Sequence, residues 1–110
     1  MKAYRYTVKG RGIFISLKLL DEKKNYMLPD ELDDFYDAET RFNTDLECPP
    51  IYKGYRNWFT EAGCKEFKEE LDKLLYLYRK YGFEPKEEIR EIADISEAKY
   101  ADVYQMLLPA

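Results

Sequence analysis

The stretch that most constrains the fold runs from residue 60 to residue 81 and is followed by Gly82. Its apolar residues recur at spacings of three and four, which places them on one face of a helix with 3.6 residues per turn. The remaining positions are mostly charged, so the opposite face should contact water. An isolated helix of this length is marginally stable and needs a surface to pack against. The apolar stripe consists of Phe67, Leu71, Leu74, Leu75 and Tyr78.

Both ends of this helix are marked by suitable residues. The hydroxyl of Thr60 can accept a backbone N–H of the first turn and so cap the helix. Arg79 and Lys80 suit the negative end of the helix dipole, and Gly82 can adopt the left-handed conformation that closes a helix. Gly63 is the one local misfit, because glycine costs roughly 1 kcal/mol relative to alanine in a helix. We therefore expect one long amphipathic helix.

The N-terminal part of the chain favours β-structure. Residues 2–9 are rich in aromatic and β-branched side chains, and Gly-Arg-Gly at 10–12 follows them, so a strand ending in a turn is predicted. Residues 13–20 alternate as a strand would, although three of their apolar residues also share a helical face. We favour a hairpin through Gly-Arg-Gly over a strand, glycine turn and helix. Gly-Arg-Gly lacks the remaining residues of a phosphate-binding loop.

The C-terminal part completes the predicted fold. Residues 86–95 fit a helix begun at Pro85 or a strand equally well, whereas residues 103–108 form a short apolar strand ended by Pro109. The fold class is therefore α+β. A small antiparallel sheet, made of the N-terminal strand or hairpin and the C-terminal strand, packs against the long helix at about 60–81. A length of 110 residues suits a single domain.

Charge is strongly separated along the chain, although the net charge is only −4. Residues 1–24 hold seven bases and two acids, whereas residues 25–48 hold eight acids and one base. Most charge runs are simply solvated surface, but here apolar side chains interrupt the acids, so the segment can also dock. Pro29 could open a short helix with Leu32, Phe35 and Tyr36 inward.

This acidic segment supplies the main candidate site. Its carboxylates could occupy positions where a partner protein binds phosphates, and its aromatic rings could anchor the contact. The acidic candidates are Asp30, Glu31, Asp33, Asp34, Asp37 and Glu39, and the aromatic candidates are Phe35, Tyr36 and Phe42.

A second candidate surface comes from the aromatic and basic residues near 51–59 and the N-terminal arginines. Aromatic faces beside cations are used by proteins that stack on bases and contact phosphates of single-stranded nucleic acid. The structural interpretation, which we favour for this segment, is that these rings pack beneath the start of the long helix. The candidates for nucleotide or nucleic-acid binding are Arg5, Arg11, Lys53, Arg56, Tyr52, Tyr55 and Trp58.

The composition excludes several kinds of chemistry. The chain has no histidine, which removes Ser-His-Asp, Cys-His and histidine general-base mechanisms. Its two cysteines, Cys48 and Cys64, cannot complete a four-ligand zinc site within one chain, and we expect both to be reduced. Asp33 and Asp37 could pair as acid and base, but no partner group is identifiable. We assign no catalytic residue, metal or cofactor and favour a function other than catalysis.

The sequence also limits the cellular setting. No apolar run approaches the roughly 20 residues of a membrane span, and no signal peptide opens the chain, so we expect a cytoplasmic protein without a membrane partner. Most of the eleven tyrosines are expected to pack at the rim of a small core. Tyrosine also suits binding surfaces, so the remainder could contact other proteins, including further copies of the chain.

Three short sequence motifs make the chain similar to other proteins. They are Tyr-Arg followed by Gly-Arg-Gly-Ile-Phe near the start, Trp-Phe-Thr-Glu-x-Gly at 58–63, and Tyr-x-Asp-x-Tyr-Gln at 100–105. Together they resemble small uncharacterised proteins of Gram-positive bacteria and their phages, and no activity is implied. The acidic segment with its aromatic residues leads to the hypothesis of a protein-binding module, of the kind that phages use to inhibit a host defence nuclease, as anti-CRISPR proteins do. The alternatives are nucleotide or single-strand binding and a structural phage protein.

Overall fold

The computed structural model describes residues 1–110 and shows an α+β protein with a six-stranded antiparallel sheet and four α-helices. The expected fold class is confirmed at this level. The strands are β1 (Lys2–Val8), β2 (Arg11–Gly12), β3 (Tyr55–Thr60), β4 (Lys86–Glu91), β5 (Tyr100–Ala101) and β6 (Gln105–Pro109). The α-helices are α1 (Leu17–Asp21), α2 (Pro29–Asp45), α3 (Glu61–Glu66) and α4 (Lys68–Lys80), with 3₁₀ turns at Lys24–Tyr26 and Ile95–Glu97.

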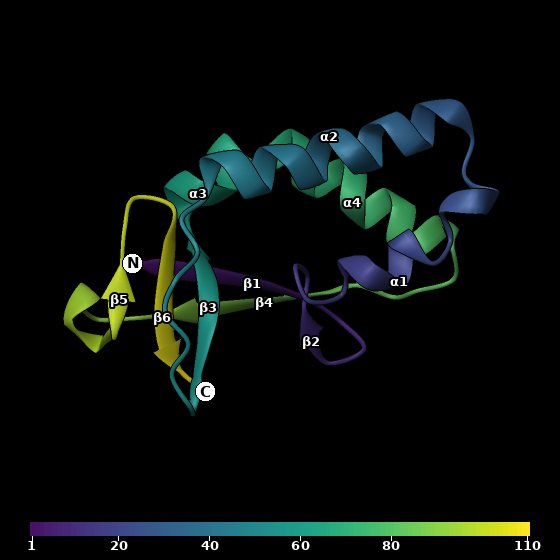
Figure 1. Ribbon diagram of the computed structural model, residues 1–110. Coiled ribbons are helices and arrows are strands. Elements are labelled where there is room, and N and C mark those ends of the chain that lie inside the picture. Colours follow the sequence, from purple (N-terminus) through teal and green to yellow (C-terminus); the bar gives the residue numbers. More distant parts are fainter. The chain divides into compact units, whose positions relative to one another are not determined.

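The strands follow the order β2-β1-β3-β6-β5, and β4 also pairs with β1. The strands β3 and β6 pair from Tyr55 opposite Pro109 to Phe59 opposite Gln105, and they lie side by side in Figure 1. β1 reaches β3 through Ala3, which lies opposite Thr60. The sheet therefore contains the predicted N-terminal and C-terminal strands, together with strands that the sequence pattern did not define.

The chain divides into two compact units, each assembled from separated segments. The first unit comprises Met1–Arg5, Glu47–Lys68 and Glu87–Ala110, and the second comprises Tyr6–Leu46 and Glu69–Lys86. The first holds most of the sheet together with α3. The second holds α1, α2 and nearly all of α4.

The core of the first unit lies on β3 and β6. Trp58, Met106 and Leu108 are buried there with Ala3 and Ile92. Alternate residues of a strand point to opposite faces, so Met106 and Leu108 share one face. The intervening positions of β6 are buried as well, which explains why this strand reads as a continuous apolar run.

The predicted long helix is replaced by two helices, α3 and α4. The predicted cap is present, because the Thr60 hydroxyl accepts the Gly63 N–H at 3.0 Å. The backbone leaves the helical region at Phe67, which has φ −106° and ψ 19°. The Phe67 side chain is completely buried and packs edge-on against Tyr104, with ring centroids 5.4 Å apart. A contact with a distant segment therefore accompanies the break, and the local sequence contains no helix breaker there.

The second unit is built on the antiparallel pair α2 and α4, which lie side by side in Figure 1. The helix predicted to begin at Pro29 is confirmed and extends to Asp45. Its buried apolar face is Phe35, Ala38 and Phe42, whereas Tyr36 is 42% exposed and does not point inward as predicted. On α4 the buried residues are Leu71, Leu74, Leu77 and Tyr78.

Residues 9–20 differ from the favoured prediction. Lys9 and Gly10 both have positive φ, 53° and 76°, as a two-residue hairpin turn of type I′ requires. This turn brings Val8 opposite Arg11, so a hairpin exists but closes one position earlier than expected. The strand predicted over 13–20 is wrong, because the chain turns into α1 instead. Residues 86–95, left open above, contain the strand β4.

Candidate functional site

The acids of α2 fall into two sets, and the first set is used inside the second unit. Glu31 is only 7% exposed, and its carboxylate pairs with the Lys80 ammonium. It also accepts the Tyr81 hydroxyl at 2.6 Å and the Leu28 backbone N–H at 2.8 Å. The hydrogen bond from Lys80, with those from Tyr81 and Leu28, lowers the pKa of Glu31 from 4.5 to about 2. Glu31 thus fixes the start of α2 to the end of α4.

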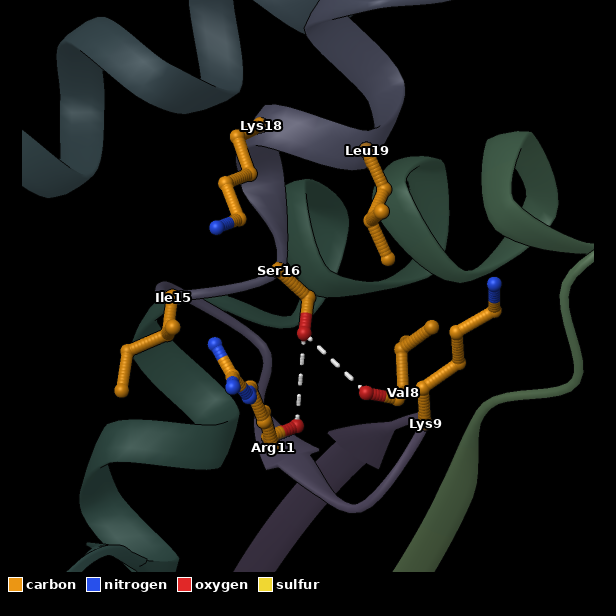
Figure 2. A pocket seen from close by; sticks show the side chains of 7 residues that line it. All are labelled: Val8, Lys9, Arg11, Ile15, Ser16, Lys18 and Leu19. Atoms are coloured by element: carbon orange, nitrogen blue, oxygen red, sulfur yellow. Dashed lines mark hydrogen bonds between the residues drawn. The ribbon is translucent and has the colours of Figure 1, made fainter.

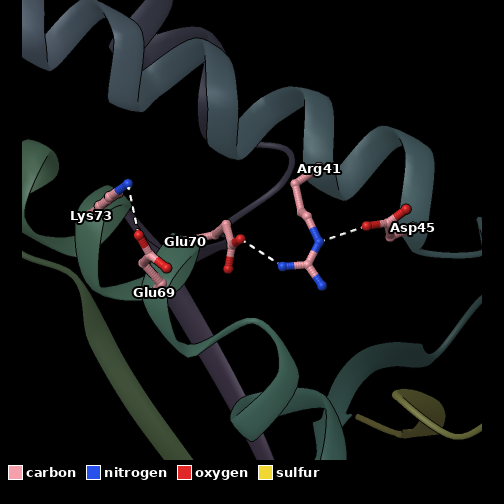
Figure 3. A network of polar contacts seen from close by, with 5 residues as sticks. All are labelled: Arg41, Asp45, Glu69, Glu70 and Lys73. Carbon is pink, nitrogen blue, oxygen red and sulfur yellow. Dashed lines mark hydrogen bonds and ion pairs between the residues drawn. The ribbon is translucent and has the colours of Figure 1, made fainter.

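Two further ion pairs join the same helices. The Arg41 guanidinium bridges Asp45, at 2.6 Å, and Glu70 of α4, at 2.7 Å (Figure 3). Its hydrogen bonds to Asp45 and then Glu70 raise the pKa of Arg41. Asp34 lies 3.4 Å from the Lys73 ammonium. Glu31, Asp34 and Asp45 therefore have partners within the protein.

The second set forms an unpaired row on the outer side of α2. The side chains of Asp30, Asp33 and Asp37 are exposed and form no ion pair or hydrogen bond. Their spacing of three and four residues places them on one face of the helix, and Tyr36 lies beside them. We call Asp30, Asp33, Tyr36 and Asp37 the α2 acidic face. Glu39, also without a partner, is half-buried.

Two of the three aromatic anchors predicted for this segment are in the core. Phe35 is completely buried and Phe42 is 5% exposed. The Phe42 ring packs edge-on against Phe14, with centroids 4.9 Å apart. Both rings have the helical spacing of a core stripe, and this explains why they are unavailable to a partner. Tyr36 is the aromatic candidate that remains on the surface.

The candidates for nucleic-acid binding are also divided. Trp58 is 4% exposed and lies under the Arg90 guanidinium, 4.7 Å from its ring, so it offers no stacking face. Arg5 pairs with Glu88 at 3.6 Å, and its side chain is 14% exposed. Arg11 belongs to the second unit, whereas Trp58 and Arg5 belong to the first. The buried Trp58 ring and the paired Arg5 side chain are therefore not available for stacking or phosphate contact.

The remaining four candidates lie together in the first unit. The rings of Tyr52 and Tyr55 are 6.3 Å apart in an edge-to-face arrangement. The Lys99 ammonium lies 5.2 Å from the Tyr52 ring centroid and 6.0 Å from that of Tyr55. Lys53 and Arg56 are exposed on the same segment. We call these five residues the Tyr52 cluster. Lys99 was missed in the sequence because no local spacing connects it with a segment more than 40 residues away.

Other kinds of site find little support in the geometry. No group of three or more Cys, Asp or Glu side chains converges closely enough to hold a metal ion. Cys48 and Cys64 are free thiols. None of the helices combines the length and apolar character needed to cross a bilayer.

The fold and its surfaces define a small α+β protein with one acidic helix face and one aromatic-basic cluster. No known protein family, curated protein or solved structure matches the chain.

Proposed function

We propose that this protein is a binding module that docks the α2 acidic face onto a basic surface of another protein. The observation that carries the proposal is the row formed by Asp30, Asp33 and Asp37, which are exposed and have no partner within the protein. The fold uses Glu31 and Asp34 to hold α2 to α4 and pairs Asp45 with Arg41, but it makes no such use of these three. Mutual repulsion of like charges on one helix face is mildly destabilising, so an external cation would relieve it.

The helix rise of 1.5 Å per residue spaces the three carboxylates about 4.5 and 6 Å apart along the axis. A rigid row of this kind can present negative charge to a groove that normally holds phosphates. Tyr36 adds a ring next to the row, and tyrosine is frequent at the energetic centres of interfaces. The more specific form of the proposal is therefore an inhibitor of a nucleic-acid-binding enzyme, such as a host defence nuclease, of the type that phages encode.

The test compares three forms of the protein in affinity capture from a bacterial lysate treated with nuclease. One form is unaltered, one carries Asp30→Asn, Asp33→Asn and Asp37→Asn, and the control carries Glu84→Gln, Glu87→Gln and Glu97→Gln, which are exposed acids elsewhere. Both variants change the net charge equally. We expect a partner that is retained by the unaltered and control forms, is lost from the Asp→Asn form, and dissociates in high salt. Equal capture by all three forms would refute the proposal.

A second function is favoured by the Tyr52 cluster. The Lys99 ammonium lies against the rings of Tyr52 and Tyr55. Tyr52 is 42% exposed. A base stacked on such a ring contributes about 1–3 kcal/mol, and the adjacent cations would contact the phosphates. Under this alternative the protein binds nucleotides or single-stranded nucleic acid through the first unit.

Fluorescence anisotropy of a labelled oligothymidylate measures this second function directly. Trp58 emission is a poor probe because that ring is buried. Tyr52→Ala should weaken binding about tenfold, the effect of losing one stacked base, and affinity should fall steeply with salt. Tyr76→Ala removes a tyrosine that is 58% exposed on α4 and should have no effect. Absence of binding at low salt would exclude this function.

A further inference from the structure

The second unit contains a pocket that neither proposed surface uses. It lies where the β1–β2 hairpin meets α1 and has a volume of about 150 Å³. Its lining consists of Val8, Lys9, Arg11, Ile15, Ser16, Lys18 and Leu19 (Figure 2).

The interior of this pocket is apolar. Its apolar lining consists of Val8, which is 1% exposed, the half-buried Leu19, and Ile15, which is 61% exposed. The one hydroxyl there, Ser16 Oγ, is buried and lies 3.2 Å from the Val8 carbonyl oxygen and 3.4 Å from that of Arg11. Because its single proton is donated to one or the other of these carbonyl oxygens, the Ser16 oxygen faces the pocket as an uncharged acceptor. A cavity of about this volume accepts a single benzene-sized ring in a well-studied engineered case.

The rim of the pocket is cationic. Lys9, Arg11 and Lys18 line it, no acidic side chain does, and all three are exposed. Arg11 and Lys18 form no ion pair within the protein. In Figure 2 their charged ends lie on the same side of the pocket, beside Ile15, while the Lys9 ammonium lies on the other side of Val8. The Lys9 ammonium also lies 5.4 Å from the Phe83 ring centroid. Two cations on one side of the pocket, with a third lining residue that is also cationic, favour a ligand with more than one negative charge.

We infer that this pocket binds an aryl phosphate group, with the ring against Val8 and Leu19 and the phosphate between the cationic side chains. A phosphate monoester carries −1.5 to −2 charges at neutral pH and accepts hydrogen bonds from arginine and lysine. The same group occurs in free aryl phosphates and in phosphotyrosine side chains of proteins. The inference does not depend on the α2 acidic face, because the two sites share no residue.

The test is a titration of the full chain with phenyl phosphate, followed by ¹H–¹⁵N NMR shifts of the pocket amides. We expect saturable shifts at Lys9, Arg11, Ser16 and Leu19. Inorganic phosphate and benzyl alcohol should each bind at least about tenfold more weakly, because each lacks one half of the ligand. Benzoate, with a single negative charge, should also bind more weakly than phenyl phosphate. Equal binding of inorganic phosphate, benzyl alcohol or benzoate would overturn the inference, as would the absence of saturable shifts.

Variants of the cationic rim distinguish specific binding in the pocket from a general effect of net charge. Arg11→Gln with Lys18→Gln should weaken phenyl phosphate binding about tenfold or more, since charge-assisted hydrogen bonds are lost. The control, Lys23→Gln with Lys86→Gln, makes the same change in net charge outside the pocket and should bind as the unaltered protein does. Equal weakening in both variants would overturn the inference. A phosphotyrosyl peptide that binds more tightly than phenyl phosphate identifies a protein source, and equal affinity identifies a free small molecule.

Discussion

Glycine has a low helix propensity, but at position 63 of α3 it is required by the packing of the fold. A Cβ at this position would lie 2.2 Å from the Tyr104 carbonyl oxygen, which itself accepts the Thr60 N–H at 3.0 Å. The Thr60 hydroxyl also lies 2.6 Å from the Val103 carbonyl oxygen. The first turn of α3 therefore sits directly on the backbone that precedes β6, and only glycine permits this approach.

We therefore predict that Gly63→Ala destabilises the protein. Alanine gains about 1 kcal/mol in helix propensity, but displacing a backbone carbonyl costs more, in the range of about 1–3 kcal/mol or above for an overpacked site. Thermal and urea unfolding measure the net loss. Gly12→Ala is the control, because a Cβ there meets no atom within 4 Å. A variant at position 63 that is as stable as the unaltered protein would contradict the close contact.

Glu31 should make the stability of the protein depend on acidic pH. The pKa of its carboxyl falls from 4.5 to about 2 on folding. A lowered folded-state pKa stabilises the protein above the unfolded pKa, and this contribution disappears as the pH falls through the folded value. Glu31→Gln should therefore lower Tm by several degrees at pH 7, with the difference shrinking between pH 4.5 and about pH 2. Asp37→Asn, at a position without an ion pair, is the control and should change Tm little at pH 7.

The helix α4 offers a test of its apolar face at two adjacent positions. Leu74 is completely buried, whereas Leu75 is half-buried. Leu74→Ala leaves a cavity and should cost about 2–5 kcal/mol. Leu75→Ala should cost only about 1 kcal/mol. Urea unfolding monitored by circular dichroism gives both values, and similar losses at the two positions would show that the helix is rotated about its axis relative to the arrangement described.

The first unit depends on residues from both ends of the chain. Ala3 of β1 is completely buried in its core and lies opposite Thr60 of β3. The Ile92 N–H also donates to the Met1 carbonyl at 2.8 Å. We therefore predict that residues 47–110, produced alone, show no cooperative thermal transition and give poorly dispersed NMR amide signals. The full chain should show a cooperative transition and well-dispersed signals. A cooperative transition in the fragment would mean that β1 is dispensable.

Local signals in the sequence were sufficient for several elements. Thr60 caps a helix, Pro29 opens one, and Gly82 adopts positive φ at 92°, each as predicted. These residues act through their own backbone conformation or through atoms a few positions away. The predicted C-terminal strand and the α+β class follow from equally local patterns of apolar residues.

The structural features that could not be predicted from the sequence depend on contacts between distant segments. The break at Phe67 accompanies its packing on Tyr104, and the need for Gly63 arises from a carbonyl about 40 residues away. The prediction of the candidate sites was limited for the same reason, since local patterns do not reveal contacts between distant segments. Phe35 and Phe42 were proposed as anchors for a partner because acids surround them in sequence, but both lie in the core, and for Phe35 this agrees with the inward helix face also predicted. Lys99 reaches Tyr52 only through the fold.

The two interleaved units also have a genetic consequence. The chain passes from one unit to the other after Arg5, Leu46, Lys68 and Lys86, so neither unit corresponds to one continuous stretch of coding sequence. A recombination event that replaced either half of the gene would bring together unmatched parts of both cores. The two units are therefore expected to be inherited as one block and to diversify by point substitution on exposed faces such as that of α2.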